Sequence, residues 1–99
     1  MELIKTQNGG ELCIALKGRL DTTTAPQLES EMRTSLPGVT ALVFDMKDLA
    51  YISSAGLRVL LSTQKVMNRQ GEMKIRNVSP EIMEIFEVTG FVDILNIES

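Results

Sequence analysis

The sequence predicts one α/β domain that contains a mixed β-sheet of about five strands with helices packed on one face. Segments with the two-residue period of strands alternate with segments of helical period, in the order ββαβαβαβ. Parallel neighbours in such a sheet are joined by right-handed helical crossovers. With 99 residues, 43% of them hydrophobic and 23% charged, the chain has enough apolar surface for one core, so residues 1–99 are expected to form a single domain.

The first two strands are expected to form a β-hairpin. Residues 2–7 and 11–17 have strand character, and Leu12 and Ile14 lie in a stretch where apolar residues alternate along one face. Between the two segments, Asn-Gly-Gly at residues 8–10 tolerates the positive φ angles of a tight turn. The hairpin therefore supplies an antiparallel pair of strands.

A helix is expected from the threonine-rich segment near Thr24 to about Ser35. Apolar residues, Met32 among them, recur there at four-residue steps and so share one helical face that belongs in the core. Thr24 and Gln27 have the spacing of a capping box, and Pro-Gly at residues 37–38 ends the helix.

The remaining segments continue the alternation and are bounded by turn residues and helix caps. In order, they are a strand at 40–46, an irregular connection through Asp48, a helix from 53 to about 69, a strand at 72–76, a helix that starts with Ser79 as its cap and Pro80, and a strand at 94–97. The run at 40–46 is the most apolar of them and should lie at the centre of the sheet.

Composition argues against several classes of function. The net charge of −3 and the scattered basic residues do not suit nucleic acid as a direct partner. The chain has no histidine and only one cysteine, Cys13, so one chain cannot assemble a zinc site or a Ser-His-Asp or Cys-His nucleophile. We therefore expect no enzyme activity, no metal and no cofactor. No apolar run approaches the roughly 20 residues of a membrane span, and no signal-peptide layout occurs, which favours a cytoplasmic location.

Ser53 and Ser54 stand where a loop enters the second helix. Helix N-termini present free N–H groups and a partial positive charge, so an anion on Ser54 would be stabilised there. The residues alone favour an ordinary helix-cap role for Ser54 and a helix-packing role for Gly56. Neither GxxxxGK[ST] nor GxGxxG occurs, so no local motif indicates nucleotide binding.

Three aspartates end or follow predicted strands. Asp21, Asp45 and Asp48 could gather near the second helix as a metal-binding carboxylate cluster. The pattern favours the common role of aspartate in capping helices and ending strands.

Two motifs occur together at a specific spacing. Residues 18–21 read Gly-Arg-Leu-Asp before a threonine-rich helix start, and residues 48–57 read Asp-Leu-Ala-Tyr-Ile-Ser-Ser-Ala-Gly-Leu. Together they resemble the STAS domain family, and in particular bacterial anti-sigma factor antagonists. The resemblance spans nearly the whole chain, including residues 71–73 and 86–91.

The resemblance implies that Ser54 is phosphorylated by a serine kinase that is also an anti-sigma factor. The unmodified protein would bind this kinase and free the sigma factor for transcription, phosphorylation would release the kinase, and a PP2C-type phosphatase would reset the cycle. The residues implied to bind the partner are Asp21, Thr22, Ser53, Ser54, Ala55, Gly56 and Leu57.

The sequence differs from the common family pattern at one position. Ser53 takes the place often occupied by aspartate, which makes it a competing phosphorylation site. The same difference keeps open an alternative function, in which the chain is a STAS adaptor subunit of a transport, secretion or signalling assembly without sigma-factor output.

Overall fold

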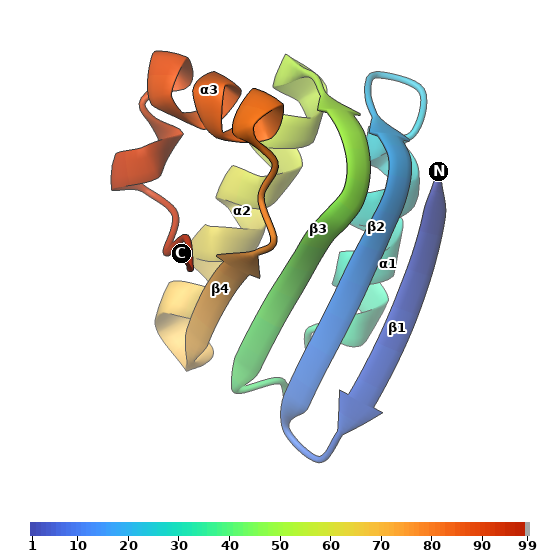
Figure 1. Cartoon of the computed structure of the whole chain (residues 1–99). Helices are drawn as coiled ribbons and strands as arrows, with labels where there is room; N and C mark the ends of the chain where they lie inside the picture. Colours follow the sequence, from blue (N-terminus) through green and yellow to red (C-terminus); the bar gives the residue numbers. More distant parts are fainter. Residues whose placement is uncertain (99) are drawn as a thin grey trace.

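The computed structural model describes residues 1–98 and contains a four-stranded sheet (Figure 1). The strands lie in the spatial order β1-β2-β3-β4, which is also their order along the chain. β1 pairs with β2 antiparallel, whereas β2 with β3 and β3 with β4 are parallel. The strands are β1 (Glu2–Asn8), β2 (Glu11–Leu20), β3 (Ala41–Ile52) and β4 (Glu72–Arg76).

Helices provide the crossovers between the parallel strands. The helical elements are α1 (Ala25–Ser35), α2 (Ser54–Gln70), α3 (Pro80–Thr89) and the 3-10 turn η1 (Phe91–Asp93). α1 and α2 lie behind the sheet in Figure 1, and the front of the sheet carries no helix of the described chain. α3 packs against the end of β3. The α/β fold with helices packed on one face is thus confirmed.

The core lies between the helices and the covered face of the sheet. Alternate residues of β2 and β3 point into it, as the two-residue period predicts, and Met32 and Met67 fill it from the helices. Burying each large apolar side chain contributes roughly 1.5–3 kcal/mol. The largest fully buried side chains are Phe44, Phe86, Leu12, Ile14, Leu16, Leu20, Leu28, Leu42, Met46, Ile52, Leu60 and Met67.

The predicted irregular connection after residue 46 is wrong, because β3 continues to Ile52. The extension is held by β2, which runs past its predicted end and pairs in parallel with β3 up to Leu20↔Ile52. Two register shifts interrupt this pairing, and Gly18, with φ of 99°, stands at the second one. Because the strands end side by side, the residues that follow them meet at one edge of the sheet.

The predicted final strand at 94–97 is also wrong. The structure has a single parallel bridge there, between Ile97 and Ile75, so the sheet has four strands instead of about five. The backbone N–H groups of Ile94 and Leu95 both donate to the carbonyl of Phe91, at 3.0 and 2.9 Å. This tight turn takes up the residues that a strand would need, and the backbone contact with β4 is limited to Ile75, which bonds to Asn96 and Glu98 on either side of Ile97.

Candidate functional site

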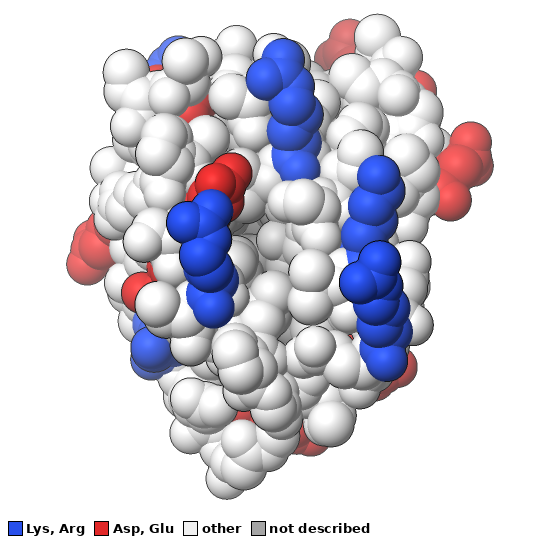
Figure 2. Space-filling model, turned by 180° about the vertical axis from the view of Figure 1, so that it is seen from behind, with Lys and Arg blue, Asp and Glu red and all other residues white. Residues whose placement is uncertain are grey.

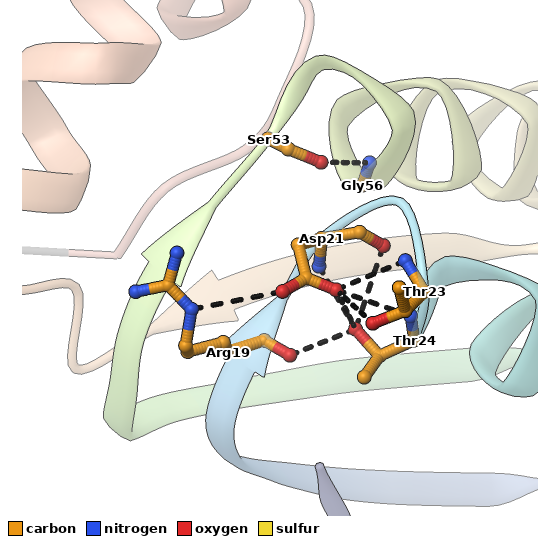
Figure 3. Close-up of polar contacts among 6 residues, drawn as sticks. All are labelled: Arg19, Asp21, Thr23, Thr24, Ser53 and Gly56. Carbon is orange, nitrogen blue, oxygen red and sulfur yellow. Dashed lines mark hydrogen bonds and ion pairs between the residues drawn. The ribbon is translucent and has the colours of Figure 1, made fainter.

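The candidate site lies where β2 and β3 end and where α1 and α2 begin (Figure 3). The backbone N–H of Ser53 donates to the carbonyl of Leu20 at 2.9 Å, which ties the two strand ends together. Asp21 follows one strand and Ser53 follows the other. The structure therefore brings together the two motifs that the sequence places more than thirty residues apart.

Asp21 is held rigidly by the turn that leads into α1. Its Oδ1 accepts hydrogen bonds from the Thr23 hydroxyl at 2.7 Å, the Thr23 N–H at 3.0 Å and the Thr24 N–H at 3.2 Å (Figure 3). The hydrogen bond from the Thr23 hydroxyl is the main reason that the pKa of Asp21 lies below its ordinary value. Asp21 is therefore a fixed negative charge and a poor proton acceptor.

The capping box predicted for Thr24 and Gln27 is wrong. Thr24 precedes α1, but its side chain makes no capping hydrogen bond to the helix. Its hydroxyl instead lies 2.8 Å from the carbonyl of Arg19, to which it donates, and accepts from the backbone N–H of Asp21 at 2.8 Å. The N–H of Ala25 is satisfied by the Asp21 carbonyl at 2.8 Å. Thr24 thus braces the turn that carries Asp21.

Arg19 and Tyr51 are members of the site that the sequence analysis did not single out. They are register partners across β2 and β3, and the Arg19 guanidinium lies 4.4 Å from the centre of the Tyr51 ring. Arg19 Nε is also 3.6 Å from Asp21 Oδ2. Tyr51 keeps 38% of its surface exposed, so the stacked pair forms part of the outer surface beside Asp21. The sequence shows that Arg19 and Tyr51 belong to the two motifs, but it does not show that they meet. The strand register places them side by side.

Ser53 and Ser54 have different structural roles. Ser53 is the N-cap of α2, since its Oγ accepts from the N–H of Gly56 at 3.4 Å and its carbonyl accepts from the N–H of Leu57 at 2.9 Å. Ser54 is the first residue of the helix, and it is exposed. The helix-cap interpretation therefore applies to Ser53, and the hydroxyl of Ser54 has no capping bond within the described chain.

The other predicted partner-binding residues fall into two groups. Thr22 and Ala55 line a groove of about 390 Å³ between the starts of α1 and α2, together with Arg58. Gly56 and Leu57 are buried, with Leu57 only 6% exposed, and pack α2 against the strand ends. Gly56 and Leu57 therefore support the surface from beneath, and the exposed or half-buried members of the predicted set lie on that surface.

The three strand-end aspartates do not gather into a metal site. Asp45 accepts hydrogen bonds from the Lys47 N–H at 3.1 Å and from Asn77 Nδ2 at 3.0 Å, and Asp48 pairs in register with Lys17. Residues 1–98 contain no group of three or more His, Cys, Asp or Glu side chains arranged to hold a metal ion. Over the same residues, no helix is both long enough and apolar enough to cross a membrane.

Comparison with known proteins identifies the family. Residues 2–99 match the sequence model of the STAS domain. The chain belongs to the STAS domain family. Two relatives of this STAS chain carry informative names. BtrV from Bordetella bronchiseptica, provisionally named an anti-sigma factor antagonist, is 38% identical over 96 residues, which is 95% of this chain and 83% of BtrV. The anti-sigma-B factor antagonist of Bacillus subtilis is 30% identical over 94% of this chain and 86% of its own length.

Solved STAS structures share the fold. The phosphorylated form of SpoIIAA, a Bacillus cell fate determinant, aligns with a TM-score of 0.77 at 19% identity and covers 99% of this chain and 92% of its own. The fold of this chain is therefore one already known from solved structures.

Proposed function

We propose that this STAS protein is an anti-sigma factor antagonist controlled by phosphorylation of Ser54. The unmodified protein binds an anti-sigma factor that is also a serine kinase, and the phosphorylated protein releases it, so that sigma-factor-dependent transcription is regulated. The observation that carries the proposal is the exposed Ser54 hydroxyl at the first residue of α2, beside a Ser53 that is already used as the cap. Relatives named as anti-sigma factor antagonists support the same function.

Charge alone is sufficient for the release step. A phosphate adds about −1.5 to −2 charges to a surface that must press against the partner. Asp21, whose hydrogen bonds lower its pKa, is already negative on the same edge of the sheet. If the added repulsion and desolvation cost about 3 kcal/mol in binding, the affinity falls on the order of 100-fold. The fold itself does not need to change.

The partner surface in this proposal consists of Asp21, Thr22, Ser53, Ser54 and Ala55, with Gly56 and Leu57 holding it in place. The chain acts by binding and catalyses no reaction. A PP2C-type phosphatase removes the phosphate, and the cycle takes place in the cytoplasm, where the kinase has access to ATP. Residues 1–99 act as a single domain.

Phosphorylation by the cognate kinase is the direct test. The protein is incubated with the anti-sigma factor kinase of its source organism and ATP, and the modified residue is identified by mass spectrometry. We expect one phosphate on the parent and on Ser53→Ala, and none on Ser54→Ala. The matched serine variants separate the two candidate sites: phosphate that persists on Ser54→Ala and disappears from Ser53→Ala would assign the switch to Ser53.

A binding measurement tests the switch itself. The phosphorylated protein should bind the kinase about 100-fold more weakly than the unmodified protein, by the free-energy estimate above. Ser54→Asp should weaken binding in the same direction but less, because aspartate carries one negative charge and a phosphate nearly two. Equal affinities for the phosphorylated and unmodified proteins would contradict the proposed release mechanism.

A further inference from the structure

α2 is a cationic helix in an acidic protein. Its 17 residues include Arg58, Lys65 and Arg69 and no aspartate or glutamate, whereas the whole chain has a net charge of −3. The three cations are spaced seven and then four residues apart, which is two turns and one turn of an α-helix. They therefore form a row about 16 Å long on a single face.

These three side chains point into solvent and have no acidic partner within residues 1–98. All three residues are exposed. Figure 2 views the molecule from the helix side and shows basic side chains standing on this face, with acidic ones mainly towards the rim. On α1, by contrast, Arg33 is neutralised by Glu29 at 2.8 Å. The ion pairs of the described chain use Lys5, Arg19, Arg33, Lys74 and Arg76.

A partly apolar groove runs beside the cationic row. It lies between α1 and α2 and has a volume of about 330 Å³. Its lining consists of apolar Met32, Leu36, Val59 and Val66 and polar Glu29, Arg33, Ser62 and Thr63. Val66 is 39% exposed and stands next to Lys65 in the chain. An apolar strip with charges along its edge is the usual composition of a protein-binding surface.

We propose that this face, defined as Arg58, Lys65 and Arg69 with the adjoining groove, docks an acidic surface of the anti-sigma factor kinase. The inference rests on the proposed function and adds a second contact to it. Arg58 lies one helical turn after Ser54 and lines the groove that also contains Thr22 and Ala55, so the cationic row continues directly from the predicted partner-binding residues. One partner protein can therefore contact the cationic row and the predicted partner-binding residues at the same time.

The charge pattern favours an acidic protein over nucleic acid. Tight DNA binding neutralises about 6–10 phosphates, and this face offers three cations on a molecule whose net charge is negative. Complementary charge on a protein partner acts mainly on the association rate and on specificity, which a row of three cations is sufficient to supply. The face thus steers the kinase towards Ser54.

The test measures association of the unmodified protein with the kinase at low and at physiological salt. The variants are Lys65→Glu and Arg69→Glu, and Lys47→Glu on β3 is the matched control with the same change of charge at an exposed position away from α2. We expect each α2 variant to weaken binding about tenfold at low salt, mostly through slower association, and the control to change it less than about twofold. Lys65→Gln, which removes one charge, should give an intermediate effect.

The possible outcomes separate the two proposals. If the parent binds the kinase and Lys65→Glu, Arg69→Glu and the control Lys47→Glu all weaken binding equally, the docking face is refuted while the proposed function stands. If the parent neither binds the kinase nor is phosphorylated on Ser54, both are refuted. A short DNA duplex is titrated in parallel: if the α2 variants lose DNA binding but keep their affinity for the kinase, the face belongs to nucleic acid and the proposal is wrong. Thermal unfolding of each variant checks that the fold is intact.

Discussion

At Gly56, α2 packs closely against the strand ends. A Cβ at this position would lie 2.7 Å from Leu20 Cγ and 2.9 Å from Ile52 Cγ1. Both side chains are buried, with exposed fractions of 0% and 2%, and the contacted atoms are not flexible chain ends. Gly56→Ala must therefore displace either the core or the start of the helix that carries Ser54.

Two opposing effects decide how far Gly56→Ala changes the free energy of unfolding. Alanine in place of glycine within a helix contributes about 1 kcal/mol of stability through helix propensity. Forcing a methyl group into a packed core costs about 1–3 kcal/mol. Because the two overlaps involve branch and mid-chain atoms, the steric cost should exceed the gain, and we expect Gly56→Ala to lose about 1 kcal/mol net. For a domain of this size, that lowers Tm by about 4–8 °C.

Urea unfolding of the parent, Gly56→Ala, Leu20→Ala and the double variant measures this effect. Leu20→Ala alone should cost about 2–5 kcal/mol because it leaves a cavity. In the Leu20→Ala background, the overlap with Leu20 Cγ is gone, so Gly56→Ala should become neutral or stabilising. The coupling energy between the two substitutions should therefore be about 1–2 kcal/mol. An equal loss in both backgrounds, or no loss in the parent, would refute the steric explanation.

Three further predictions follow from individual contacts. Ser53→Ala removes the cap of α2 and should cost about 0.5–1 kcal/mol of unfolding free energy, since the capping hydrogen bond is long at 3.4 Å. Ser53→Asp should retain the parent's stability in urea unfolding. Equal losses for both variants would exclude capping as the cause. The pKa of Asp21 is lowered in the folded protein, so its contribution to stability is present above its unfolded pKa of about 3.9 and is lost as pH falls through the lower folded value. Asp21→Asn should therefore reduce the drop in Tm on acidification below about pH 4, and an unchanged pH profile would contradict this assignment. Gly71→Ala should prevent stable folding, because a Cβ there would lie 1.8 Å from the Thr40 carbonyl oxygen. A cooperative thermal transition near that of the parent would contradict this prediction, because it would show that the close approach can relax.

Local signals were sufficient to predict many of the elements. The hairpin turn, α2, β4 and α3 all lie where turn residues, helical period and caps place them. Ser79 accepts from the N–H of Ile82 at 3.2 Å, as a serine cap before a proline predicts. Such signals act between residues a few positions apart, so a single segment contains them completely.

The errors occurred where a hydrogen-bond partner outside the expected pattern decided the local structure. Lys47 and Asp48 lack a clear strand pattern, yet they lie in β3 because β2 supplies the hydrogen-bonding edge. Thr24 and Gln27 have capping-box spacing, but the Thr24 hydroxyl is taken by the Arg19 carbonyl and the Asp21 N–H. A distant strand satisfies the backbone of β3, whereas residues of the same turn satisfy Thr24, and the expected pattern contained neither set of hydrogen bonds.

For the candidate site, residue types and their spacing predicted a serine at a helix start and an aspartate after a strand, in a chain without histidine. The folded structure was needed to show that Ser53 is the cap and Ser54 is exposed, that Arg19 stacks on Tyr51, and that the cations of α2 have no partner within the described chain. The physical reason is that residue type sets what a side chain can do, whereas strand register and helix packing set which groups it meets and whether water reaches it.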